Sequence, residues 1–249
     1  MSDPSSRHAV RAEFERAAEG FAERTAGRFD GLDAVAFSRI GSGSTVLEVG
    51  AGTGNFLALF EGVASRRLAA DLTPGMLDVA RRRHPDLELV AADGARLPFP
   101  RASIDLVCSA QALHHIARPV PVIMEMRRVV APDGRVLVVD QVAPERLEEA
   151  RARNELDTIR DPTHAASRPP SAMRTIVQAA GLTIVDERIV ESEGRLSQWM
   201  WAGEFPPERI AAVRRFIEVR GPETGMGFQP DGEDWTFRRS RMMILTIRT

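Results

Sequence analysis

Short apolar runs alternate with amphipathic stretches over the first 142 residues of the chain. Up to about residue 40, apolar residues recur every three or four positions, which predicts helix, and a Gly-Ser run at 41–44 would end it. Apolar runs of strand length follow at 45–49, 67–70, 87–91, 104–109 and 135–142. The stretches between them predict helices over 55–62, 74–83 and 119–130. Strands that alternate with helices indicate an α/β fold with a parallel sheet and helices on both faces.

The pattern loosens after residue 142. Helices are expected over 144–160, 171–180 and 206–219, and strands over 182–190 and 235–247. A proline-rich loop at 161–170 and a turn-rich segment at 221–234 interrupt them. Because no repeat and no linker stands out, we expect one domain over residues 1–249. Its parts would be a helical N-terminal cap (1–43), a core (44–142) and a C-terminal part (143–249) with further strands.

Composition and charge exclude several classes of protein. The chain has 33 Lys and Arg against 35 Asp and Glu, so it shows no basic footprint for nucleic acid or for a membrane surface. No apolar run approaches the roughly 20 residues that span a bilayer, and the N-terminus lacks the apolar core of a secretory signal. The single cysteine, Cys108, excludes an internal disulfide and a cysteine zinc cluster, and we expect it to be buried and inert. We therefore expect a cytoplasmic protein without nucleic-acid or membrane partners; a homodimer stays open.

A glycine-rich turn follows the first expected strand directly. Glycines stand at 50, 52 and 54 in VLEVGAGTGN, where a ligand could approach the main chain closely. A Walker A loop is excluded because Asn55, and not Lys-Ser/Thr, follows Gly54. The dinucleotide fingerprint G-x-G-x-x-G would need its third glycine one residue later, although an NAD-dependent oxidoreductase remains an alternative. Glu48, two positions before Gly50, favours a ligand with an ammonium group over a pyrophosphate.

Two further carboxylates stand where expected strands end. Asp71 lies 21 residues after Gly50 and could accept hydrogen bonds from ribose hydroxyls, or only help to begin the helix at Pro74. Asp93 could accept from an adenine amino group, or only form an Asp-Gly turn. Met76 could pack on a purine or belong to the core. Together with Glu48, this set suits a ligand with an amine, a ribose and an adenine, and without phosphate.

Four segments in order carry a family resemblance: VLEVGAGTGNF, AADLTPGMLDVAR, AADGARLPFPRASIDLVCS and RRVVAPDGRVLVVD. They resemble the motifs of class I S-adenosylmethionine-dependent methyltransferases, most of all the small-molecule subgroup related to ubiquinone/menaquinone biosynthesis. The resemblance covers about residues 10–142. It implies a Rossmann-like, doubly wound sheet of seven strands, mostly parallel with the last strand antiparallel, and with 182–190 and 235–247 as the final pair. It also implies methyl transfer from S-adenosylmethionine to an O, N or C atom of a small-molecule acceptor in biosynthetic or secondary metabolism, leaving S-adenosylhomocysteine.

The same resemblance assigns the core to the cofactor and a substrate lid to residues 143–249. The positions implied around the methionine part are Glu48, Gly50, Ala51, Gly52 and Gly54. Those implied for the ribose and adenine are Asp71, Leu72, Met76, Asp93, Gly94 and Ala95. Ser109 and Gln111 would lie near the sulfonium. Phe14 and Phe21 occupy the N-terminal segment in which relatives often place a tyrosine over the cofactor.

Histidines are the candidates for acid–base chemistry. Displacement at a sulfonium needs alignment above all, but an acceptor that must lose a proton needs a base, and histidine is suited to that role. His114 and His115 follow the fourth strand and are the catalytic candidates; the alternative is local packing. His164, Trp199 and Trp201 are substrate candidates; the alternatives are a solvated loop and core packing. No metal site is expected, and a protein that binds S-adenosylmethionine without catalysis stays the alternative from another class.

Overall fold

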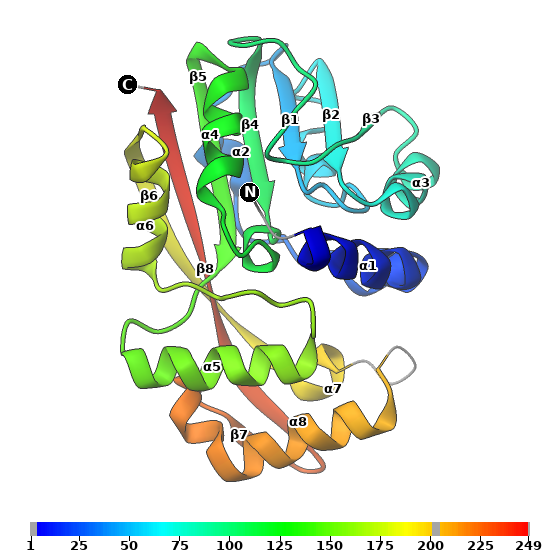
Figure 1. Ribbon diagram of the computed structural model, residues 1–249, viewed down its shortest axis with the longest axis vertical. Helices are drawn as coiled ribbons and strands as arrows, with labels where there is room; N and C mark the ends of the chain where they lie inside the picture. The colour runs from blue at the N-terminus through cyan, green and yellow to red at the C-terminus, as the bar shows by residue number, and fades with distance from the viewer. Residues whose placement is uncertain (1–3, 201–204, 249) are drawn as a thin grey trace.

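The computed structural model describes residues 4–200 and 205–248, and Figure 1 shows a sheet with helices around it. The strands are β1 (Thr45–Val49), β2 (Arg66–Asp71), β3 (Glu88–Ala91), β4 (Ile104–Ala110), β5 (Val130–Gln141), β6 (Leu182–Arg195), β7 (Gln229–Asp231) and β8 (Asp234–Arg248). Their order in the sheet is β3-β2-β1-β4-β5-β8-β6, with the short β7 paired to β8. The strands from β1 to β5 are parallel, whereas β8 runs antiparallel to β5 and β6. The expected Rossmann-like α/β sheet is confirmed, with β7 as an eighth strand.

Helices pack around this sheet close to the expected positions. They are α1 (Pro4–Arg24), α2 (Ala34–Ser38), α3 (Pro74–Arg83), α4 (Val120–Val129), α5 (Leu147–Arg160), α6 (Pro170–Ala179), α7 (Leu196–Trp199) and α8 (Pro207–Arg220). Short 3₁₀ turns stand at η1 (Leu57–Phe60), η2 (Leu113–His115) and η3 (Gly221–Thr224). Several helices begin at or next to proline, whose fixed φ and missing N–H suit a first turn.

The helix expected over 55–62 is wrong, because only the four-residue η1 forms there. Gly54 and Gly62 take φ values of 81° and 75°, which bound a segment too short for a stable α-helix. The apolar spacing that suggested a helix instead buries Phe56, Leu57 and Phe60 in the core beside the sheet. No extended helix dipole therefore follows the glycine turn.

Beyond the edge of the parallel strands, β6 and β8 continue and carry a separate small body (Figure 1). We call this body the lid: α5, α7, α8, β7 and the adjoining ends of β6 and β8. It has an apolar cluster of its own, which includes Leu156, Leu196, Val213 and Phe237. Two larger clusters cover the sheet itself. No helix among the described residues is long and apolar enough to cross a membrane.

Candidate active site

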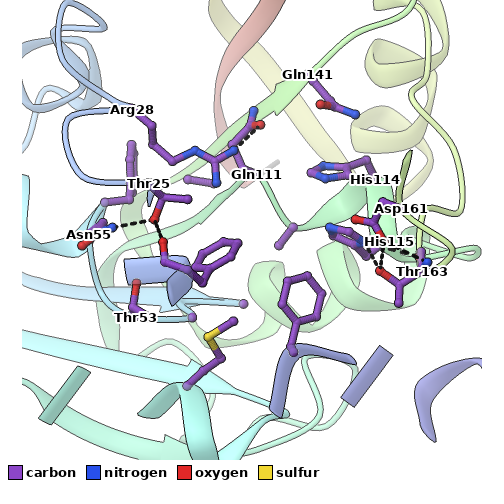
Figure 2. A pocket seen from close by; sticks show the side chains of 18 of the residues that line it. Thr25, Arg28, Thr53, Asn55, Gln111, His114, His115, Gln141, Asp161 and Thr163 are labelled. Carbon is purple, nitrogen blue, oxygen red and sulfur yellow. Dashed lines mark hydrogen bonds between the residues drawn. The ribbon is translucent and has the colours of Figure 1, made fainter. Parts of the chain in front are cut away.

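A cavity of about 930 Å³ lies between the carboxyl ends of the parallel strands, helix α1 and the lid. This edge of an open α/β sheet is where ligands bind, and the volume is at the upper end for small-molecule sites. Figure 2 shows polar side chains arranged around its open centre, with Arg28 and Gln111 on one side and the histidines opposite. The strand ends contribute Glu48, Asp71 and Asp93, and the lid contributes aromatic and arginine side chains.

The three glycines of the turn after β1 all have positive φ, but they differ in the space that a side chain would find. A Cβ on Gly50 would lie 2.6 Å from the Cβ of Ala112, and one on Gly54 would lie 2.8 Å from Cδ1 of Leu87. Packing therefore leaves no room for a side chain at Gly50, and at Gly54 a side chain would have to displace the end of Leu87. A Cβ on Gly52 would meet nothing within 4 Å, so this glycine faces open space in the cavity wall. Gly52 is thus the position at which a ligand could approach the backbone.

Asp71 ties the end of β2 to the glycine turn. Its Oδ2 accepts the N–H of Gly52 at 2.8 Å, and its Oδ1 accepts the N–H of Thr73 at 2.8 Å. Burial raises the pKa of Asp71, although these N–H groups oppose the rise. A carboxylate oxygen has two acceptor sites, so each oxygen could accept a further hydrogen bond from a ligand.

Glu48 is a buried carboxyl in the cavity wall. Its side chain is 1% exposed, and its Oε2 has no hydrogen-bond partner among the described residues. Burial, and then the charge of Asp71, raise the pKa of Glu48 well above its ordinary value. A buried carboxyl with an unsatisfied oxygen is costly, and a cationic ligand would satisfy it.

Asp93 forms the turn that was the alternative to an adenine contact, since its Oδ1 accepts the N–H of Ala95 at 3.0 Å. It also lines the cavity, as do Ala51, Leu72 and Gly94. Met76 is 2% exposed within a cluster of α1 and α3, as its core alternative expected, and it also lines the cavity, so its contact with a purine stays a prediction.

Four predicted site residues do not line the cavity: Gly54, Ala95, Ser109 and His164. Ser109 is 1% exposed near the end of β4, with an Oγ that has no hydrogen-bond partner among the described residues, and the next two residues, Ala110 and Gln111, line the cavity instead. Ala95 packs against the core cluster over the sheet. Of the two tryptophans, Trp199 lines the cavity, whereas Trp201 lies outside the described residues.

His114 and His115 both line the cavity from η2, and Figure 2 shows them next to one another. His114 is held by Asp140 at the end of β5: Nδ1 lies 2.6 Å from Oδ1, and the backbone N–H donates to Oδ2 at 3.0 Å. Burial alone would raise the pKa of Asp140, but the charge and hydrogen bond of His114 outweigh it and hold that pKa low. The sequence reasoning missed Asp140, although the strand-end position that drew attention to Asp71 applies to it equally.

His115 is packed rather than paired with a carboxylate. Its ring meets Phe14 of α1 edge-on at 4.9 Å between centroids, and its Nδ1 lies 3.1 Å from Oγ1 of Thr163. Burial, and then the neighbouring His114, lower the pKa of His115 to about 3. This imidazole is therefore neutral at physiological pH.

His164 lies behind His114, with 5.8 Å between the ring centroids. Its Nε2 lies 2.9 Å from Oδ1 of Asn154 and 3.8 Å from the buried Asp157. Burial lowers its pKa to about 4. His164 therefore does not line the cavity, because the loop folds inward and buries it, so its contact with substrate stays a prediction that this structure does not favour.

Residues 47–138 match the model of the methyltransferase domain family. The chain carries a methyltransferase domain. The match begins within β1 and ends within β5, and it contains β2 to β4, the glycine turn, Asp71, Asp93 and the two histidines. The resemblance to S-adenosylmethionine-dependent methyltransferases is confirmed on these residues.

Relatives agree with the methyltransferase domain. The uncharacterized methyltransferase YcgJ of Bacillus subtilis is 28% identical over 169 residues, which are 66% of this chain and 67% of that protein. A demethylmenaquinone methyltransferase of Renibacterium salmoninarum is 36% identical over 39% of this chain and 41% of its own length. The chain therefore matches less than half of that enzyme's length.

Solved structures extend the likeness of fold beyond the methyltransferase domain. The crystal structure of YcgJ superposes with a TM-score of 0.77 at 22% identity, covering 87% of this chain and 97% of that one. A proposed methyltransferase from Bacillus halodurans reaches a TM-score of 0.80 at 24% identity, with 88% and 99% covered. These shares are larger than the 47–138 stretch, so the likeness of fold extends beyond the residues of the domain match.

Arginines on the lid side were missed by the sequence reasoning. Arg153, Arg160, Arg239 and Arg241 line the cavity there, and Arg28 joins them from the loop after α1. Nη2 of Arg28 donates to Oε1 of Gln111 at 3.0 Å (Figure 2). No local motif marks these residues, which stand far apart along the chain.

Proposed function

We propose that this chain transfers a methyl group from S-adenosylmethionine to a small-molecule acceptor bound under the lid. The observation that carries the proposal is one continuous cavity that joins the strand ends of the methyltransferase domain to the lid. Several further expectations remain predictions. They are a small-molecule acceptor, a role in biosynthetic or secondary metabolism, a cytoplasmic location, the lack of a nucleic-acid partner and the formation of a homodimer.

The strand-end side of the cavity fits the cofactor. Glu48 has an unsatisfied buried oxygen suited to the ammonium group, and Gly52 leaves open space beside the backbone. Asp71 has acceptor capacity for the ribose hydroxyls. Leu72, Met76 and Asp93 lie along the same wall, where the adenine would be held.

The segment from Gln111 to His115 would contact the acceptor. S-adenosylmethionine, when bound, supplies a methyl group activated by the sulfonium. His114 is oriented by Asp140 through Nδ1, which leaves Nε2 as the atom able to accept a proton from an acceptor hydroxyl, amine or acidic C–H. Phe14, Phe21 and Trp199 line the same cavity and would help to exclude water.

The test is formation of S-adenosylhomocysteine from S-adenosylmethionine against a panel of hydroxyl, amine and activated-carbon acceptors. The proposal predicts acceptor-dependent product that the Gly52→Val variant does not form. Cofactor binding without turnover on any acceptor would favour the non-catalytic binding protein. Failure to bind the cofactor would overturn the proposal.

A further inference from the structure

Seven arginines line the cavity. Arg16 and Arg209 lie beside the carboxylate of Glu13, and the other five form a cluster at the lid end: Arg28, Arg153, Arg160, Arg239 and Arg241. Arg153 and Arg160 stand two helical turns apart on α5, and Arg239 and Arg241 point to the same face of β8, because side chains of a strand alternate. Pairing of β8 between β5 and β6 brings that face beside the sheet's ligand-binding edge.

Few of these arginines are neutralised. Arg153 donates from Nε to Asp157 at 2.8 Å. By contrast, Arg28 and Arg241 have neutral acceptors: Oε1 of Gln111 at 3.0 Å and the carbonyl oxygen of Arg28 at 2.6 Å. The Nε atoms of Arg160 and Arg239 are buried without a hydrogen-bond partner among the described residues.

The carboxylates near the cluster have other hydrogen-bond partners and act on these arginines only through their charge: Asp140 opposes the lowered pKa of Arg28 and Arg241, and Asp161 and Asp157 oppose that of Arg160. Asp140 holds His114, Asp157 holds Arg153, and Asp161 accepts the hydroxyl and the N–H of Thr163 at 2.7 and 2.9 Å. Glu193 also lines the cavity, but it is exposed to solvent. Arg28, Arg160, Arg239 and Arg241 therefore form no ion pair within the part of the chain that the structure describes.

The arginines also repel one another. Burial, and then Arg241, lower the pKa of Arg28 to about 9 and that of Arg239 to about 10. Cations that are withdrawn from water with their charge only partly balanced are costly to a fold, and an anion among them would offset this cost. The cluster is next to apolar surface, since the guanidinium of Arg160 lies 4.8 Å above the ring of Trp199.

We propose that the arginine cluster binds an anionic group, a carboxylate or a phosphate, on the methyl acceptor. The acceptor's apolar body would lie against Trp199 and Phe205, and its reacting atom would face His114. Guanidinium groups suit this role because their donors form paired hydrogen bonds to carboxylate and phosphate. This inference rests on the proposed function and gives its acceptor a chemical class.

The test titrates the full chain with benzoate, phenyl phosphate and the neutral benzamide, in the presence and absence of saturating S-adenosylhomocysteine. We expect one of the anions to bind at least about tenfold more tightly than benzamide, because charged hydrogen bonds are lost with the neutral probe. The better anion identifies the group as carboxylate or phosphate. Arg160→Gln and Arg239→Gln should each weaken that anion about tenfold or more. Arg238→Gln, an exposed neighbour on β8, is the matched control and should change nothing.

Equal binding of anions and benzamide, or unchanged affinity in both glutamine variants, would overturn the inference. Anions that compete with S-adenosylhomocysteine, together with weaker S-adenosylhomocysteine binding by the variants, would assign the arginines to the cofactor's own carboxylate and also overturn it. In that case the proposed function would stand. If S-adenosylhomocysteine does not bind the unmodified chain, the proposed function fails, and the titrations without it still decide whether the cluster binds anions.

Discussion

The strand-end side of the cavity and its lid side differ in charge and in how the chain builds them. Glu48, Asp71 and Asp93 come from successive strand ends within one stretch of sequence. Arg28, Arg160 and Arg239 come from the N-terminal cap, the middle and the end of the chain. The first set is made by local motifs, whereas the second exists only after β8 has joined the sheet and α5 has packed within the lid.

This difference suggests a division of labour. A carboxylate wall suits a cofactor that carries ammonium and sulfonium charges, and an arginine wall suits an anionic acceptor. Opposite charges at the two ends would also orient each molecule, since like charge at the wrong end is penalised. His114 stands on η2, at the border between the two sides.

Gly52→Val should have the largest effect, because it should abolish cofactor binding at the strand-end side of the cavity. A β-branched side chain at φ 53° is strained and would project into the space proposed for the cofactor, so we expect no measurable S-adenosylhomocysteine binding by calorimetry. Gly62→Val is the matched control, because Gly62 also has positive φ and open surroundings but does not line the cavity. Equal binding by both variants would mean that the cofactor does not lie on this turn.

His114→Ala tests whether His114, which lies between the strand-end side and the lid side of the cavity, acts as the base. If His114 is the base, kcat should fall by about 10²–10⁴, with little change in cofactor affinity. His115→Ala is the comparison. Because the pKa of His115 is lowered to about 3, this residue does not titrate near neutrality, and its variant should keep the wild-type shape of the pH–rate profile between pH 6 and 8. A near-normal kcat in His114→Ala would leave positioning alone as the source of catalysis.

Asp71→Ala should weaken S-adenosylhomocysteine binding by roughly 2–4 kcal/mol, about 30- to 1,000-fold, because buried hydroxyls lose a charged acceptor and Gly52 loses its anchor. Asp78→Ala, on the exposed side of α3, is the control and should bind normally. This substitution should not affect the lid side of the cavity, so the arginine cluster of Asp71→Ala should still bind anions. A folded Asp71→Ala protein with unchanged cofactor affinity would contradict the ribose assignment.

Of these variants, Glu48→Gln should change the protein least, and it should raise rather than lower the free energy of unfolding. Because burial raises the pKa of Glu48 above its ordinary 4.5, its ionisation favours the unfolded chain, and this loss of stability grows as pH rises above 4.5. The variant without ligand should therefore melt about 2–4 °C higher at pH 8 if roughly 1 kcal/mol is recovered, with no difference at pH 4. It should also bind the cofactor more weakly. A lower melting temperature at pH 8 would mean that the carboxylate stabilises the fold.

The predictability of the structure follows the same division. The alternation of strands and helices up to β5 and the boundaries of α3 follow from local periodicity, proline and glycine signals, whereas the antiparallel pairing of the last strands is implied only by the family resemblance. The helix predicted over 55–62 was wrong because the spacing of buried apolar residues is similar in an α-helix and in a 3₁₀ turn. Asp140 could have been found by the strand-end rule. The hydrogen bond from Arg241 to the carbonyl oxygen of Arg28 could not have been predicted, because it depends on the path of β8, which no local signal encodes.

The cofactor that the strand-end side of the cavity accepts decides between methyl transfer and an NAD-dependent function. Calorimetric titration of the full chain with S-adenosylmethionine and, separately, with NAD tests this choice. We predict one S-adenosylmethionine bound per chain, with binding lost in Gly52→Val and kept in Gly62→Val, and no heat of binding from NAD. Binding of NAD, or the absence of S-adenosylmethionine binding by the folded protein, would contradict the account.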